Sequence, residues 1–160
     1  MLVVAAAIVK QPAPRRTGPP PLPCGAVTFR LDAVRGATAG LPGEVDYRLA
    51  RQHAIAEFRR GRLSRLDVCD AQPELLRNAR ELGESTTQTC PICEASQLVL
   101  VTYVFGSRLP ASGRCISSKG ELAQLSRRTT ELAAYVVEVC QECAWNHLAR
   151  TFLIGGRRTG

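Results

Sequence analysis

The chain has 160 residues, 45% of them hydrophobic, and its 21 lysines and arginines outnumber its 14 aspartates and glutamates, which gives a formal charge of +7. A chain of this size suits one small domain, and because it contains no apolar run of 18 residues we expect no membrane-spanning helix. The positive charge is compatible with an acidic partner such as RNA or DNA, although residues 45–160 carry only sixteen cations against twelve anions.

The first 44 residues differ in composition from the rest of the chain. Six prolines fall between residues 12 and 23, and Gly36, Gly40 and Gly43 follow. Apart from a candidate strand at 26–31, this stretch lacks a helical or strand period, so we predict a disordered extension over 1–44. Another interpretation is that the natural chain begins near Val45. The apolar start, MLVVAAAIVK, lacks the basic residues and cleavage region of a secretory signal, which favours a cytoplasmic protein.

Residues 45–60 have the pattern of an amphipathic helix that ends at Gly61. Its apolar stripe recurs every three or four residues, at Tyr47, Ala50, Ala54 and Phe58. Four arginines fall largely off that stripe and are the candidate nucleic-acid contacts, namely Arg48, Arg51, Arg59 and Arg60. The alternative interpretation of these arginines is an ordinary solvated helix face.

A second short helix is predicted within residues 68–83. Asp70 is a suitable N-cap, Pro73 suits the first turn, and Gly83 suits the end. With the preceding helix, this makes residues 45–88 a predicted helical segment. Cys69 precedes the helix and is interpreted as a small buried side chain rather than a reactive thiol or a metal ligand.

Residues 89–156 are expected to form a domain with an antiparallel sheet. β-branched and aromatic residues predict strands at 97–105, 133–139 and 145–154. Residues 106–118 indicate a loop or a weak strand, residues 118–132 a helix, and residues 157–160 a frayed tail. The predicted fold is therefore α+β, with a zinc-ribbon-like three-stranded antiparallel sheet and an inserted helix, preceded by two short helices and the disordered extension.

Four of the seven cysteines form two CxxC pairs, and these are the candidate metal ligands: Cys90, Cys93, Cys140 and Cys143. Paired CxxC motifs in a protein without a secretory signal favour a metal over disulfides. Zinc prefers a tetrahedron of such thiolates, and a site closed by four of them stabilises the fold without activating water. Buried thiols without metal, a thioredoxin-like redox pair and iron–sulfur ligation are the alternatives.

No other residues form a convincing catalytic group. The sequence contains no P-loop, nucleophile elbow, dinucleotide fingerprint or HExxH motif, so we expect a protein without enzymatic activity. His147 and Cys115 are considered as additional ligands, but four cysteines already satisfy zinc. Trp145 is interpreted as packing over the second cysteine turn rather than as a platform for a nucleic-acid base.

Several segments resemble an uncharacterised family of small actinobacterial proteins, a domain of unknown function. The resemblance covers about residues 45–156 and rests on VDYRLARQ, VCDAQPELLRNARELGE, CPICEASQLVLVTYVFG, the tripeptide SGR at 112–114, and VVEVCQECAWNHLARTFLIGG. The resemblance implies that Cys90, Cys93, Cys140 and Cys143 belong to the family pattern, and it implies a cytoplasmic protein. It implies no particular activity.

Three functions remain open from the sequence. The first is a zinc module that docks on nucleic acid or on a nucleoprotein machine such as the ribosome or RNA polymerase, by analogy with other zinc ribbons. The second is a protein–protein adaptor whose two helices pack on a partner. The third is a thiol redox sensor that uses Cys69 or Cys115.

Overall fold

The computed structural model describes residues 43–156, which contain four helices and six strands. In chain order these are β1 (Val45–Asp46), α2 (Arg48–Arg59), α3 (Arg65–Val68), α4 (Pro73–Leu82), β2 (Glu84–Thr89), β3 (Gln97–Phe105), β4 (Arg114–Cys115), α5 (Lys119–Ser126), β5 (Leu132–Val139) and β6 (Asn146–Ile154). The predictions made for residues 1–42 and for the tail at 157–160 lie outside the described residues. Within the described part, no helix combines the length and the apolar character needed to cross a membrane.

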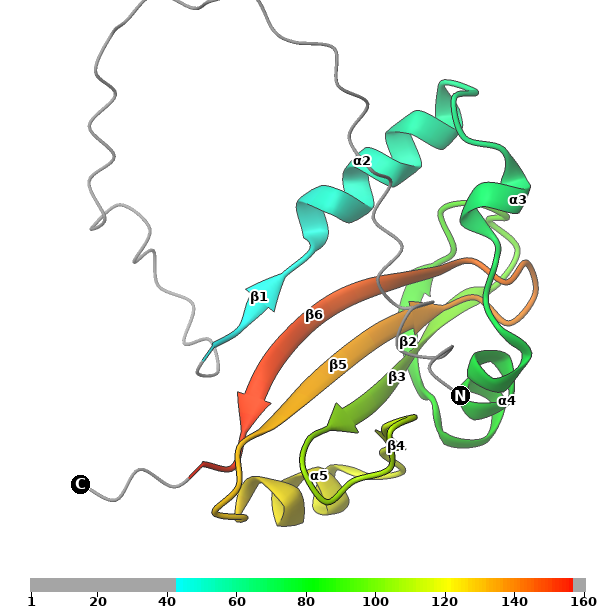
Figure 1. Cartoon of the computed structure of the whole chain (residues 1–160). Coiled ribbons are helices and arrows are strands. Elements are labelled where there is room, and N and C mark those ends of the chain that lie inside the picture. Colours follow the sequence, from blue (N-terminus) through cyan, green and yellow to red (C-terminus); the bar gives the residue numbers. More distant parts are fainter. Residues whose placement is uncertain (1–42, 157–160) are drawn as a thin grey trace, which may run out of the picture.

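The strands form one antiparallel sheet in the order β1-β6-β5-β3-β2 (Figure 1). The short strand β4 pairs with the C-terminal part of β3, at Tyr103 and Val104. Its centre is the trio β3, β5 and β6, whose β-branched residues were the basis of the strand prediction. β3 and β5 pair without interruption from Val99 opposite Val139 to Phe105 opposite Ala133. The α+β class and the antiparallel trio are confirmed.

The sheet has six strands where the sequence predicted three. The additional strands are short or polar: β1 and β4 have two residues each, and β2 reads ESTTQT. Neither length nor hydrophobic alternation marks such segments as strands. β1 and β2 belong to residues 45–88, so this expected helical segment also contributes both edges of the sheet that residues 89–156 complete.

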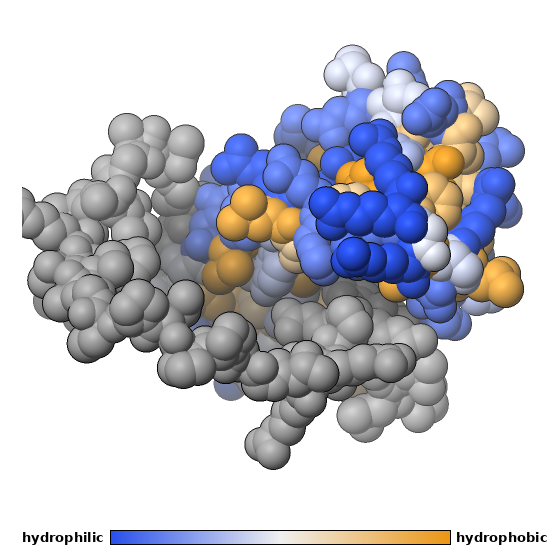
Figure 2. Space-filling model, turned by 90° about the horizontal axis from the view of Figure 1, so that it is seen from above, coloured by the Kyte–Doolittle hydropathy of each residue, from blue (hydrophilic) through white to orange (hydrophobic). Residues whose placement is uncertain are grey.

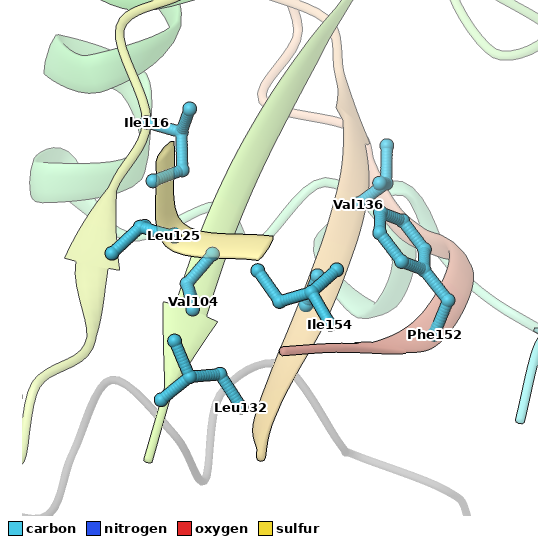
Figure 3. Packing of buried hydrophobic residues seen from close by; sticks show 8 residues of the cluster. Val104, Ile116, Leu125, Leu132, Val136, Phe152 and Ile154 are labelled. Atoms are coloured by element: carbon cyan, nitrogen blue, oxygen red, sulfur yellow. The ribbon is translucent and has the colours of Figure 1, made fainter. Parts of the chain in front are cut away.

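One face of the sheet is covered by α5 and by the segment around β4. Eight buried side chains pack there: Val104, Ile116, Leu125, Leu132, Ala134, Val136, Phe152 and Ile154. Figure 3 shows the aliphatic side chains of β3, β5 and β6 meeting those of Ile116 and Leu125. We call this group the apolar cluster. It contains no buried charged residue and needs only side-chain packing to exclude water.

The opposite face is covered by α4. Leu75 and Ala79 of this helix pack with Val101 and Val137 of the central strands. Gly83 ends α4 as predicted, and a side chain at this position would collide with Val99 and with the carbonyl of Ala79. The glycine therefore allows the chain to turn directly from the helix into β2.

The helix boundaries differ from the prediction at several points. The first helix begins at Arg48 rather than 45, because Val45 and Asp46 pair with β6. It ends at Arg59, one residue before the predicted end.

The second predicted helix, within residues 68–83, is α4, although Gln72 rather than Asp70 is its N-cap; α3 is an additional short helix that was not predicted. Asp70 instead accepts a hydrogen bond from the amide of Asn146, at 3.1 Å. The inserted helix ends at Ser126, because Leu132 already belongs to β5.

Candidate metal centre

The first CxxC pair lies in a tight turn between β2 and β3, which we call knuckle 1 (residues 90–96). The backbone N–H of Cys90 donates to the carbonyl of Ser96 at 2.8 Å, and the N–H of Glu94 donates to the carbonyl of Cys90 at 3.1 Å. Glu94 takes a positive φ of 55°, a conformation unusual for a residue with a side chain. The turn therefore points both thiols to one side of the chain.

The second pair lies in an equivalent turn between β5 and β6, which we call knuckle 2 (residues 140–145). The N–H of Cys140 donates to the carbonyl of Trp145 at 2.8 Å, and the N–H of Ala144 donates to the carbonyl of Cys140 at 3.1 Å. Ala144 has a φ of 63° and takes the place that Glu94 has in knuckle 1. Two segments 50 residues apart thus fold into the same local structure, and this repetition favours a shared ligand.

Strand pairing brings the two knuckles together. Val99 near the start of β3 lies opposite Val139 at the end of β5, so the turn that precedes β3 and the turn that follows β5 meet at one end of the sheet. The Sγ atoms of Cys90 and Cys143 are 3.6 Å apart, and those of Cys93 and Cys140 are also 3.6 Å apart. All four sulfurs lie within 4.8 Å of one another.

These distances fit a single tetrahedral ion. A metal–sulfur bond of about 2.3 Å places the corners of a tetrahedron about 3.8 Å apart, close to the two measured contacts. Cys90, Cys140 and Cys143 are buried and Cys93 is half-buried. The four predicted ligands are therefore assembled, and the cluster can hold a metal ion.

The electrostatics of the four thiols also favour a cation. Burial raises the pKa of Cys143, and the neighbouring thiols of Cys140, Cys90 and Cys69 raise it further. Burial likewise raises the pKa of Cys90. Without a positive ion, this pocket cannot hold four thiolates, because each negative charge is poorly solvated and repels the others.

Cys140 is the exception among the buried thiols. Burial alone raises the pKa of Cys140, but hydrogen bonds from the Ser96 hydroxyl and from the backbone N–H groups of residues 143 and 142 lower it to about 7. The oxygen of Ser96 lies 3.1 Å from the Cys140 sulfur. Knuckle 1 therefore supplies a donor to a thiolate of knuckle 2, and this interaction was not predicted from the sequence.

A buried carboxylate supports knuckle 2. Glu138 is 4% exposed, and its Oε1 accepts hydrogen bonds from Nε of Arg51 at 2.6 Å and from Nε1 of Trp145 at 3.0 Å. Trp145 in turn packs in the cluster that contains Cys90, Cys140 and Cys143. One feature of the sequence points to the buried position of Glu138: it is the only charged residue in the otherwise apolar strand LAAYVVEV.

The other candidates from the sequence lie outside the four-sulfur cluster. His147 stacks on Trp145 with ring centroids 5.9 Å apart, and Cys115 lies in β4 beside Tyr103. Burial raises the pKa of Cys115 to about 11, so its thiol is protonated at neutral pH. Trp145 is 1% exposed, which confirms its packing role and leaves no ring face free for a base.

Cys69 is a fifth thiol beside the site. It packs against the same cluster, and its thiol interacts with that of Cys143. The next residues are tied to knuckle 2, since the N–H of Ala71 donates to the carbonyl of Ala144 at 3.0 Å. Burial raises the pKa of Cys69, which keeps it a protonated thiol next to the four clustered cysteines.

The four arginines predicted to form one basic face have different surroundings. Arg51 does not lie on the outer face but turns inward to Glu138, at 23% side-chain exposure. Arg48 pairs with Asp46 at 2.7 Å, and Arg60 pairs with Glu57 at 3.0 Å. Arg59 is exposed and has no ion-pair partner among residues 43–156. The arginines are therefore not equivalent, and Arg59 is the most available to a ligand.

Comparison with known proteins identifies relatives but no activity. Residues 42–159 match a family described as "Family of unknown function (DUF5318)". The uncharacterized protein Mb0050 of Mycobacterium bovis and the uncharacterized protein Rv0049 of Mycobacterium tuberculosis are each 43% identical over 114 residues, covering 71% of this chain and 83% of the relative. No solved structure matches.

Proposed function

The chain belongs to this family of unknown function (DUF5318), and we propose that it is a non-enzymatic binding module held together by one structural zinc ion. The observation that carries the proposal is the convergence of four thiols from two matched turns within 4.8 Å. Tetrahedral sites with four sulfur ligands are typical of zinc or iron. The four cysteine sulfurs lie close enough together to bind one ion. In a multinuclear iron–sulfur cluster, cysteine sulfurs bound to different irons lie farther apart.

A structural role is favoured over a catalytic one. Four thiolates fill the tetrahedron and leave no position for water or substrate. The ion instead neutralises thiolates that are buried beside Trp145 and Leu98, and it links β2, β3, β5 and β6 at one end of the sheet. A site of reduced thiolates requires a reducing compartment, which supports a cytoplasmic location.

Docking on nucleic acid or on a nucleoprotein is the activity that the charge distribution favours. Residues 48–65 contain six arginines and one glutamate, whereas the rest of residues 43–156 contains eight cations and twelve anions. The positive charge is thus concentrated on α2, α3 and the loop between them. Contacts between arginine and phosphate are the usual basis of such docking.

The zinc proposal is tested by elemental analysis of the purified full chain. We expect one zinc per chain, and one equivalent of an alternative metal or no metal would contradict the proposal. Docking is tested by titrating a labelled nucleic acid at several salt concentrations. The logarithm of affinity should fall linearly with the logarithm of salt, by a slope that reports the number of phosphates neutralised. No binding at low salt would contradict docking but not the zinc site.

A protein–protein adaptor is the second candidate, and one observation favours it. Leu49 of α2 and Leu66 of α3 are 82% and 86% exposed, so two helices that follow one another present large apolar side chains to solvent. If they bind a protein partner, that partner should co-purify after nuclease treatment and in high salt. Replacing both leucines with serine should then release it. The third candidate, a redox sensor, is supported only by the position of Cys69 beside Cys143.

A further inference from the structure

A shallow hollow lies between α2 and knuckle 1. Its cavity volume of about 560 Å³ is in the range of small-ligand sites. Its apolar wall is formed by Ile55, Ala56 and Pro91. Its polar rim is formed by Arg51, Gln52, Arg59 and Arg60. The α2 residues recur at intervals of four, so the hollow follows one stripe of the helix.

The positive charge of this rim is only partly neutralised by the protein itself. Arg51 is bound to the buried Glu138. Arg60 shares Glu57 with Arg62, which leaves one carboxylate for two guanidinium groups. Arg59 has no carboxylate partner within the part of the chain that the structure describes. α2 lies along the upper side of the molecule in Figure 1. Figure 2 shows this side from above: hydrophilic side chains dominate the described part of the surface, and hydrophobic side chains lie between them.

We propose that this hollow is the binding site for a single-stranded segment of nucleic acid. The inference rests on the proposed docking function and specifies the site and the form of the ligand. Arg59 and Arg60 contact backbone phosphates, and the partly exposed side chains of Ala56 and Pro91 contact the face of an unpaired base.

The combination of surfaces selects a single strand over a duplex. A duplex presents phosphates and groove edges, but it hides the apolar faces of its bases inside the stack. A single strand offers a phosphate and an unpaired base face together, which match the basic rim and the apolar wall. An acidic peptide would satisfy the arginines but has no flat apolar face for the wall.

The hollow also depends on the metal centre. Pro91 lies between Cys90 and Cys93, so its position is fixed by the turn that the four-sulfur cluster closes. Arg51 reaches the same cluster through Glu138 and Trp145. The module thus places its ligand contacts directly on the element that the ion stabilises.

The test uses the metal-loaded full chain and fluorescence anisotropy with labelled oligonucleotides of about 12 nucleotides, within the site sizes known for single-strand modules. The probes are single-stranded RNA, single-stranded DNA, a duplex of the same sequence, and a polyglutamate peptide. We expect the single strands to bind about tenfold or more tighter than the duplex, because loss of one base contact changes affinity by that order. We expect no comparable binding of polyglutamate.

Two variants and their matched controls locate the site. Arg59→Ala should weaken single-strand binding about five- to tenfold, whereas Arg128→Ala, which removes the same charge from an exposed position after α5, should change it less than about twofold. Ala56→Glu places a carboxylate in the hollow and should weaken binding more strongly than Ala123→Glu on the exposed side of α5. Unchanged metal content and circular dichroism would show that each variant is folded.

The outcomes separate this inference from the proposed function. Equal or tighter binding of the duplex, preference for polyglutamate, or normal binding by Ala56→Glu would overturn the single-strand site and leave salt-dependent docking intact. Failure of every nucleic-acid probe at low salt would overturn both the site and docking. One zinc per chain would still stand in either case.

Discussion

The two ends of the central sheet are stabilised in different ways. At the end that carries α5, the apolar cluster of Val104, Leu132, Phe152 and their neighbours excludes water by side-chain packing alone. At the other end, four cysteines occupy the interior with Ile55, Val68, Leu98 and Trp145, and we call this the thiol end. One end is complete as a polypeptide, whereas the other brings together four thiols that could hold a metal ion. The comparison shows how a short chain can extend its core beyond what apolar residues provide.

Removal of the metal should separate the two ends most clearly. We expect chelation to remove stabilisation on the order of 10 kcal/mol, comparable to the whole stability of a small domain. Amide hydrogen exchange should then accelerate first in the knuckles and α2, while β5 and β6 beside the apolar cluster remain the slower region. Uniform acceleration along the chain would show that the two ends are one cooperative unit.

Substitution of single thiols sharpens the same comparison. Cys143→Ser should lose the metal, because it removes one of four ligands within 4.8 Å. Cys69→Ser is the matched control, since Cys69 contacts Cys143 but is not one of the four ligands, and it should retain one metal per chain. The measurement is the ratio of metal to protein after dialysis against a weak chelator. Metal loss in the control would make Cys69 a ligand.

Metal retention should also depend on pH in a defined direction. Protons compete with the ion for the thiolates, and burial raises the pKa values of Cys90 and Cys143. The apparent metal affinity should therefore fall steadily as the pH is lowered below neutral. An affinity that stays constant on acidification would contradict ligation by four thiolates.

A cavity in the apolar cluster should be the next largest perturbation. Phe152 is 4% exposed, and Phe152→Ala should lower the free energy of unfolding by about 3–5 kcal/mol, because it loses buried area and leaves a void. The metal-to-protein ratio of the folded variant should remain one. Loss of metal together with loss of stability would show that packing at one end controls ligation at the other.

Neutralising the carboxylate at the thiol end should have a smaller effect. Glu138→Gln leaves Arg51 without its charged partner and weakens the acceptor for Trp145, which should lower stability by about 1–3 kcal/mol. Glu142→Gln changes the same charge at an exposed position and should have an effect below about 0.5 kcal/mol. Denaturant unfolding of the metal-loaded proteins measures both. Equal effects of the two substitutions would remove the structural role assigned to Glu138.

The smallest effect is expected at the surface of the apolar end. The backbone N–H of Ser117 donates to Glu121 at 2.9 Å and, with the Ser117 hydroxyl and Arg114, lowers the pKa of Glu121. Its ionised form therefore stabilises the fold above its ordinary pKa of about 4.5, and this contribution is lost as the pH falls through the lowered value. Glu121→Gln should lower stability by about 0.5–1 kcal/mol at pH 7 and by less at pH 3. If the stability loss caused by Glu121→Gln were larger at pH 3 than at pH 7, the stabilising role of the ionised Glu121 would be contradicted.

The local patterns of the sequence were sufficient for the central elements. β-branched runs identified β3, β5 and β6, and the two CxxC motifs identified the four cysteines whose sulfurs converge, because both motifs occupy turns next to strands. The helix at 45–60 was predicted correctly in type, but its arginines were treated alike. Arg51 faces inward because Glu138, 87 residues away, needs a partner in a nearly water-free interior.

The sequence by itself determined that this chain has an α+β core and two equivalent cysteine turns, because periodicity, turn chemistry and ligand spacing act over a few neighbouring residues. Only the tertiary structure decided that both turns meet at one point, that β1 and β2 become sheet edges, and that Cys69 lies beside the cluster without being one of the four ligands. These features depend on which distant strands pair and in which register, as Val99 does with Val139. Strand pairing and register are selected by the packing of the whole core, and the sequence of a short segment does not determine them.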